Sequence, residues 1–133
     1  MKKHLFAYIG IVIGFMAMDT MWLGYLAIDT YRASMGSLLR DDFLMTPAVL
    51  FYITYTLAIL ILVVAPNAEK GLKRTALMGA IYGFAAYATY DLTNYAVMAN
   101  FPLDITIIDL IWGVVITTTA TLTGYFGYKL ADR

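Results

Sequence analysis

Three aspartates stand out in this chain of 133 residues because each lies inside a long apolar segment. They are Asp19, Asp91 and Asp109, and each is the only charged residue within its segment. An Asp at the centre of a membrane-spanning helix costs about 2.5–3.5 kcal/mol on insertion scales. Such residues in lipid are rare and mark ion pathways, proton relays and ligand sites. The three carboxyl groups are therefore the candidate site.

Aromatic and amide groups accompany these carboxyls at helical spacing. Tyr87, Asp91 and Asn94 share one helix face because they are four and three residues apart. The pattern Asp-x-x-Trp occurs twice, in the first and in the last apolar segment. An indole one turn from a carboxyl can donate its N–H or present its ring to a cation. The predicted ligand-binding residues are Asp19, Trp22, Tyr87, Asp91, Asn94, Asp109 and Trp112.

The chemistry open to this group depends on charge compensation. Neighbouring carboxylates cannot all be ionised in a low dielectric, so we expect at least one to be protonated at neutral pH. Arg32, just beyond the first segment, is the internal cation that would reverse this. If a metal binds, its ligands are Asp19, Asp91 and Asp109, and oxygen ligands favour Mg²⁺, Mn²⁺ or Ca²⁺. Protons and protonated amines fit the same groups, and no catalytic residue is predicted.

The composition disfavours a water-soluble monomer and excludes several kinds of site. Apolar residues make up 62% of the chain and charged residues 14%, against roughly 45–50% and about 25% in soluble domains. The chain has no cysteine and one histidine, His4, which excludes disulfides and the usual zinc and haem ligand sets. We therefore predict no cofactor. Zero net charge argues against a nucleic-acid partner, and the lipid bilayer is the expected one.

The apolar segments are long enough to position these groups on membrane-spanning helices. A helix needs about 20 apolar residues to cross the hydrocarbon core. The fold class is therefore all-α, an integral membrane four-helix bundle formed by one domain over residues 1–133. Short connections make neighbouring helices antiparallel. The first segment also resembles a secretory signal, but its length favours a retained span. The predicted spans lie near residues 5–28, 44–65, 75–98 and 104–127.

Basic residues predict the orientation of these spans. Seven lie at the termini and in the second connection, whereas the first connection has only Arg32 and Arg40. The positive-inside rule then makes both termini cytoplasmic, in a multi-pass protein of the cell inner membrane. At 1.5 Å per residue, the three aspartates lie roughly 13, 10 and 8 Å below the outer surface. We therefore expect them to meet in the outer half of the bundle. The seven residues are Lys2, Lys3, Lys70, Lys73, Arg74, Lys129 and Arg133.

The remaining polar and aromatic residues suggest secondary roles. Tyr52 and Tyr55 in the second span are neutral groups that could complete a polar pocket, and Tyr31 is expected along the outer interface. Gly10 and Gly14 form a small-residue pair opposite Asp19. Such pairs allow close helix packing, so a homodimer is one expected partner.

The blocks that carry the aspartates resemble a known family. Residues 19–24 (Asp-x-x-Trp-Leu-Gly), 90–96 (Tyr-Asp-Leu-Thr-Asn-Tyr-Ala) and 109–113 (Asp-x-x-Trp-Gly) are similar to the bacterial membrane proteins of domain-of-unknown-function family 2177. The similarity covers essentially the whole chain, and the blocks come in the family's order. It implies a small four-span inner-membrane protein with no assigned activity. The Phe101-Pro102 linker departs from the Trp-Pro expected there.

Three classes of function stay open. The first is a module that binds or transports a cation, proton or amine-bearing ligand through the acidic pocket. Small multidrug transporters have a similar length and span count, but they use one central acid per subunit rather than three set outward. The second is an integral-membrane enzyme on a lipid or isoprenoid substrate, with Asp acid–base chemistry. The third is a structural subunit of a larger membrane complex, whose carboxyls bond across helices.

The shape of the pocket discriminates among these functions. An aqueous route to the acids would favour transport, a lateral opening to lipid would favour the enzyme, and a closed knot would favour structure. The sequence offers no nucleotide, flavin or phosphate-binding motif, so the enzyme is the alternative and the binding or transport module is the first interpretation.

Overall fold

The computed structural model describes residues 1–131, and within that range the chain is helical and contains no strand. Arg133, counted above among the basic residues, lies outside the described residues. Three helical segments are long and apolar enough to cross a membrane, and they are Lys2–Leu26, Met45–Lys70 and Leu103–Leu130. The all-α class is therefore confirmed for the described residues, and the three segments fit a membrane protein.

The first two membrane-length segments are each built from several helical pieces. α1 and α3 both continue into a π-helical segment, η1 and η3, while α5 and α6 are continuous α-helices. The elements are α1 (Lys2–Met21), η1 (Trp22–Leu26), α2 (Ile28–Met35), η2 (Gly36–Leu38), α3 (Met45–Ala58), η3 (Ile59–Val64), α4 (Ala65–Asn67), η4 (Ala68–Lys70), α5 (Leu72–Val97) and α6 (Leu103–Leu130).

α5 covers the region of the predicted third span, but it differs in composition from the other long helices. It has 26 residues, which at 1.5 Å per residue is long enough to cross the hydrocarbon core. Four tyrosines, Asp91 and Asn94 make it less apolar, and it is not among the three membrane-capable segments. That α5 spans the membrane, which would make four spans in all, therefore stays a prediction.

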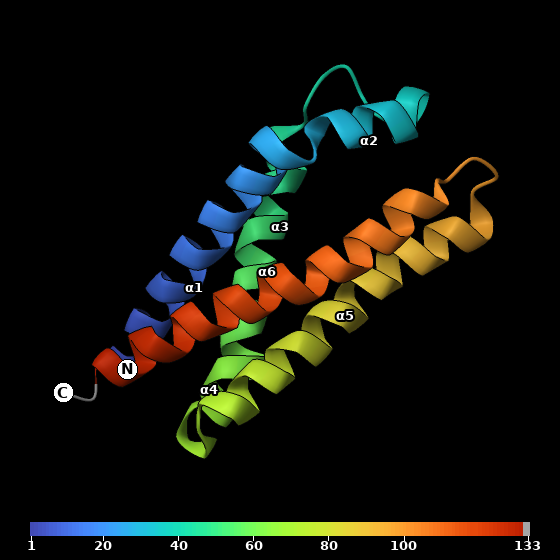
Figure 1. The fold of residues 1–133 in the computed structure, drawn as a ribbon. Coiled ribbons are helices and arrows are strands. Elements are labelled where there is room, and N and C mark those ends of the chain that lie inside the picture. Colours follow the sequence, from blue (N-terminus) through green and yellow to red (C-terminus); the bar gives the residue numbers. More distant parts are fainter. Residues whose placement is uncertain (132–133) are drawn as a thin grey trace.

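α6 is the central helix of the fold and packs along α1 on one side and α5 on the other (Figure 1). Close approach is possible because small residues lie at both contacts. A Cβ at Gly10 of α1 would collide with the backbone oxygen of Thr123. A Cβ at Gly83 of α5 would collide with the backbone oxygen of Gly113. The buried core beside these contacts includes Ile11 and Ile116.

Three charged side chains join the segments that meet at one end of the fold. The N-terminus and the end of α6 lie together there (Figure 1). Glu69 accepts a hydrogen bond from Lys3 Nζ at 3.2 Å and another from Lys129 Nζ at 2.8 Å. We call this the basic end, and the opposite end, which holds α2 and the α5–α6 turn, the aspartate end. The basic end gathers the segments predicted to be cytoplasmic, and the side of the membrane that it faces stays a prediction.

The glycine pair of α1 packs within the chain. Gly10 approaches the backbone of Thr123, and Gly14 approaches the Thr123 side chain. That face of α1 is covered by α6 and is not free for a second copy. The expectation of a homodimer therefore loses the observation on which it depended.

Candidate functional site

The two Asp-x-x-Trp patterns come together at the aspartate end. Trp22 and Trp112 stack with their ring centroids 4.3 Å apart and their planes 10° from parallel. Asp19 lies one turn before Trp22, and Asp109 lies one turn before Trp112. Stacked aromatic pairs contribute about 0.5–1.5 kcal/mol beyond their buried area. The indole pair therefore fixes the two carboxyl-bearing helices against each other.

A cavity of about 400 Å³ lies beside this indole pair. Both carboxyls line it, and α2, α3 and α5 supply the remaining walls. Five of the seven predicted ligand-binding residues are among its lining residues, and Asp91 and Asn94 are not. The lining residues are Asp19, Trp22, Leu23, Tyr31, Phe43, Ala48, Phe51, Tyr52, Tyr87, Tyr90, Asp109 and Trp112.

Each carboxyl that lines the cavity accepts a hydrogen bond from a tyrosine on another helix. Tyr52 of α3 donates to Asp19 Oδ2 at 2.5 Å. Tyr31 of α2 donates to Asp109 Oδ1 and accepts a bond from Trp22 Nε1 at 3.4 Å. Among the described residues, no donor reaches Asp19 Oδ1 or Asp109 Oδ2. Each carboxyl therefore keeps one acceptor oxygen for a further donor.

A change in helix geometry positions the first Trp. The chain switches from α- to π-helix at Trp22. The π-turn ends at Leu26, and after Ala27 the chain continues as α2 in a new direction (Figure 1). A π-turn has more residues per turn than an α-helix and is frequent at functional sites. Beyond the switch, Leu23 is 42% exposed and Leu26 is 63% exposed. Leu23 still lines the cavity and Leu26 does not, so the face of α1 that carries Asp19 ends within this π-turn.

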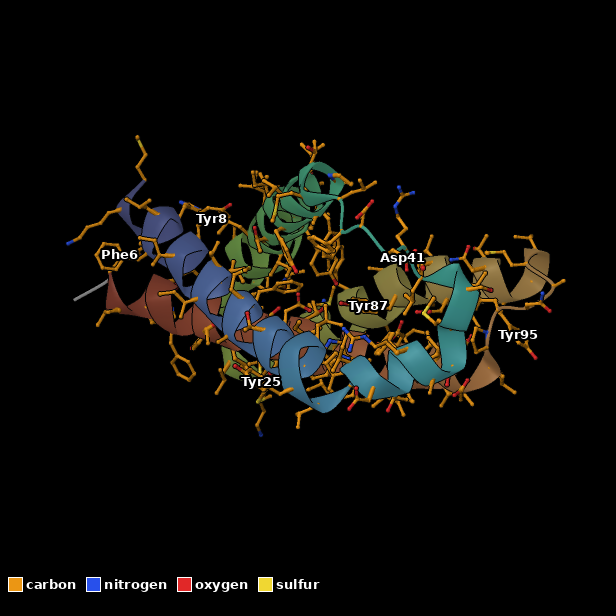
Figure 2. All side chains as sticks on the ribbon, turned by 90° about the horizontal axis from the view of Figure 1, so that it is seen from above. Phe6, Tyr8, Tyr25, Asp41, Tyr87 and Tyr95 are labelled. Atoms are coloured by element: carbon orange, nitrogen blue, oxygen red, sulfur yellow. The ribbon has the colours of Figure 1, made fainter. Side chains whose placement is uncertain are left out.

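Asp91 is buried apart from the other two carboxyls. Its side chain is fully buried, and neither of its oxygens has a hydrogen-bond partner among residues 1–131. Tyr87, one turn earlier on α5, packs on Gly113 and lines the cavity. Figure 2 shows Tyr87 near the centre of the molecule, in contrast to Tyr95 at the edge of the view. Tyr87 and Tyr90 thus line the cavity from the part of α5 that carries Asp91, while Asp91 itself does not line it.

The three aspartates do not form one ligand set. Among residues 1–131, no group of three or more His, Cys, Asp or Glu side chains is placed to hold a metal ion. Asp19 and Asp109 share a cavity, whereas Asp91 does not line it. The expectation that all three meet is therefore correct for two of them only.

α2 changes the expected roles of two residues. Tyr31 was expected along the outer interface, but its hydroxyl lies on Asp109. Arg32, the expected internal cation, is exposed, and no ion pair joins it to an aspartate within the described chain. The clue in the sequence is the spacing of Tyr31 and Ser34, because Ser34 of the same helix face bonds Asp104. Together they hold α2 along the start of α6.

A second cavity of about 470 Å³ adjoins the first and is mostly aromatic. The two cavities share four lining residues, which are Phe51, Tyr87, Tyr90 and Asp109. The second cavity adds Tyr55 and Ala86, and Asp109 is its only charged lining residue. The aspartate end thus contains a polar compartment continuous with an apolar one.

Comparison with known proteins identifies a family. The model of a family described as predicted membrane protein, DUF2177, matches residues 4–126. No curated protein and no solved structure is similar enough to match. The matched range includes both Asp-x-x-Trp patterns and Asp91. The chain therefore belongs to the DUF2177 family of predicted membrane proteins.

Proposed function

We propose that this protein binds a positively charged organic group, such as a protonated amine, in the cavity between Asp19 and Asp109. We further propose that it is a four-helix bundle of a bacterial inner membrane, with both termini in the cytoplasm and the aspartate end in the outer half of the bilayer. The observation that carries the proposal is that two carboxyls, each with one unbonded oxygen, line the same cavity.

Charge compensation supports a cationic occupant. Two carboxylates at one low-dielectric site cannot both be ionised unless a positive charge lies beside them. Arg32 is exposed and the ion pairs of Lys3 and Lys129 are at the basic end. The positive charge must therefore come from protons or from a ligand.

The walls of the cavity favour an organic cation over a metal ion. Ca²⁺ takes six to eight oxygen ligands, whereas this cavity offers two carboxyls and a few phenol groups. Its walls also include the rings of Trp22, Tyr87 and Trp112. Aromatic rings attract ammonium groups by about 0.5–1 kcal/mol at exposed sites and about 2 when desolvated. A protonated amine can use both the carboxyls and the rings.

Tryptophan fluorescence provides the test because the chain has only two tryptophans and both line the cavity. The purified protein is titrated at neutral pH with butylamine and with butanol as the uncharged control. We expect a saturable change with butylamine only, and at least a tenfold loss of affinity in Asp19→Asn and Asp109→Asn, about 1.4 kcal/mol. Asp41→Asn is the matched control, because Asp41 is exposed and does not line the cavity. Equal butylamine affinity in all four proteins would overturn the proposal.

An enzyme acting on a lipid is the second candidate, because the apolar cavity adjoins the acids. Asp19 and Asp109 would then act as general acid and base on a bound substrate. Mass spectrometry of a membrane lipid extract incubated with the protein distinguishes the two candidates. Product that forms with the wild type and not with Asp109→Asn supports the enzyme, while amine binding without product supports the binding module.

A further inference from the structure

We infer that the ligand is an amphiphile, with a protonated amine head at Asp109 and a hydrocarbon chain that enters from the bilayer between α3 and α5. This inference rests on the proposed amine site and adds the class of molecule that the site accepts. It follows from the second cavity, which an amine head alone would leave empty.

The two cavities differ in chemistry and meet at one carboxyl. Asp19 lines only the first cavity, and the apolar Ala86 lines only the second. Asp109 lines both. With volumes of about 400 and 470 Å³, each falls in the usual range of small-molecule sites, roughly 300–1,000 Å³. A molecule with a charged head and an apolar chain matches this division.

The second cavity lies between helices that do not pack tightly on each other. The backbone of the second membrane-length segment approaches α5 and α6 at η3, nearer the basic end. α3 itself reaches them through the side chain of Tyr55, whose ring lies beside those of Tyr82 and Tyr87 and whose hydroxyl bonds Thr117. Phe51 of α3 is 45% exposed and Tyr90 of α5 is 56% exposed, and both line the cavity. At this depth of a bilayer, the medium outside the gap is lipid hydrocarbon. A chain can therefore reach Asp109 sideways, without leaving the membrane.

The head group follows from charge. Heads that carry negative charge alone, such as a carboxylate or a phosphate monoester, would be repelled by Asp19 and Asp109, whereas an ammonium group can donate to the unbonded oxygen of each. Two sources supply the same chemistry, a free long-chain amine and a lipid with an ethanolamine head. A small inorganic cation would use the first cavity only.

The test measures how affinity depends on chain length. The protein in nanodiscs is titrated with butylamine, octylamine and dodecylamine, and with dodecanol, whose chain partitions alike but carries no charge. Tryptophan fluorescence reports occupancy, and affinities are expressed per ligand concentration in the bilayer. We expect dodecylamine to bind at least tenfold more tightly than butylamine, and more tightly than dodecanol.

A matched pair of variants locates the chain. Ala86→Phe fills the second cavity. Ala85→Phe places the same side chain at the preceding residue, which is exposed and does not line this cavity. We expect the dodecylamine affinity to fall at least tenfold in Ala86→Phe and to stay unchanged in Ala85→Phe. Ala86→Leu is a milder substitution if the phenylalanine variant does not fold. The wild-type ligand series is decisive without either variant.

Each outcome separates this inference from the proposed function. Equal affinities for butylamine and dodecylamine overturn the amphiphile and leave the amine site in place. Equal affinities for dodecanol and dodecylamine overturn both, because the acids then play no part. If dodecylamine binds as expected, nanodiscs of brominated phosphatidylethanolamine or brominated phosphatidylcholine separate the two sources. Selective quenching by the ethanolamine lipid assigns a lipid, and equal quenching by both assigns a free amine.

Discussion

The basic end and the aspartate end of this molecule are built from the same long helices but packed in opposite ways. Towards the basic end, Gly124 and Gly127 let α6 lie against Ile11 and the backbone of Phe6. At the aspartate end, the same helix presents Asp109 and Trp112 to a cavity. α6 thus places the large side chain of Trp112 at the aspartate end and the glycines 124 and 127 towards the basic end.

The difference shows how a small membrane protein can combine stability with a binding site. Lipid provides no hydrophobic force between helices, so close packing of small residues carries much of the association. Large aromatic residues hold the helices further apart and leave space that only directed contacts can bridge. The Trp22–Trp112 stack and the Tyr52–Asp19 bond are such contacts. We therefore expect packing substitutions to matter most at the basic end and polar substitutions at the aspartate end.

The largest effect is expected from a bulky residue on the small-residue face of α1. Gly10→Leu forces a side chain into the backbone of Thr123, which cannot move aside as a flexible side chain could. Overpacking usually costs about 1–3 kcal/mol, and we expect a loss near the upper limit. Gly24→Leu is the matched control, because nothing lies within 4 Å of a Cβ at Gly24. Thermal unfolding in detergent is the measurement, and equal Tm values for the two variants would contradict the contrast.

The buried Asp91 predicts an effect of opposite sign. Its carboxyl oxygens have no partner, and such a group costs about 1–3 kcal/mol in desolvation. Asp91→Leu should therefore raise stability by a similar amount, seen as a higher Tm. Asp19→Leu is the comparison, because it leaves the Tyr52 hydroxyl without its acceptor and should gain less. A lower Tm for Asp91→Leu than for the wild type would show that this carboxyl stabilises the fold.

The sequence predicted the elements well because span length and charge are local properties. The boundaries of α6, Leu103–Leu130, enclose the predicted span 104–127, and α5 covers most of 75–98. The stacking of Trp22 on Trp112 makes physical sense of the repeated Asp-x-x-Trp pattern. Five of the predicted ligand-binding residues line one cavity. Helical spacing predicted which of them share a helix face, such as Asp109 and Trp112, but not which helices meet.

The remaining features depend on contacts that no local pattern encodes. The π-turn at Trp22 shifts the helical phase, so Leu26 faces outward although α-helical spacing places it with Asp19. Tyr31 reaches Asp109 only because the chain bends at Ala27 and α2 then lies beside the start of α6. Depth alone could not separate Asp91 from the other two acids, since depth gives height in the bundle and not direction.

The indole stack offers a third contrast between the ends, with a smaller effect. Trp112→Phe replaces one indole of the stack by a smaller ring, so it should lose part of the roughly 0.5–1.5 kcal/mol that an aromatic pair contributes beyond its buried area. We expect a modest fall in Tm together with loss of the near-ultraviolet circular dichroism that two coupled indoles produce. Tyr25→Phe is the control, because Tyr25 is 81% exposed and should change neither signal. A coupled signal that survives in Trp112→Phe would mean that the indoles do not stack.

The smallest effect is expected at the ion pairs of the basic end. Glu69 is bonded by Lys3 and Lys129, yet its side chain is 56% exposed, so water and salt screen both pairs. Glu69→Gln should lower Tm only slightly at low salt, and the difference should vanish near 1 M salt, where the Debye length is about 3 Å. The measurement is the Tm of both proteins across a salt series. A salt-independent loss as large as that of Gly10→Leu would mean that charge, rather than the close packing of glycines, holds this end together. The contrast between the two ends would then disappear, because directed polar contacts would stabilise the basic end as well as the aspartate end.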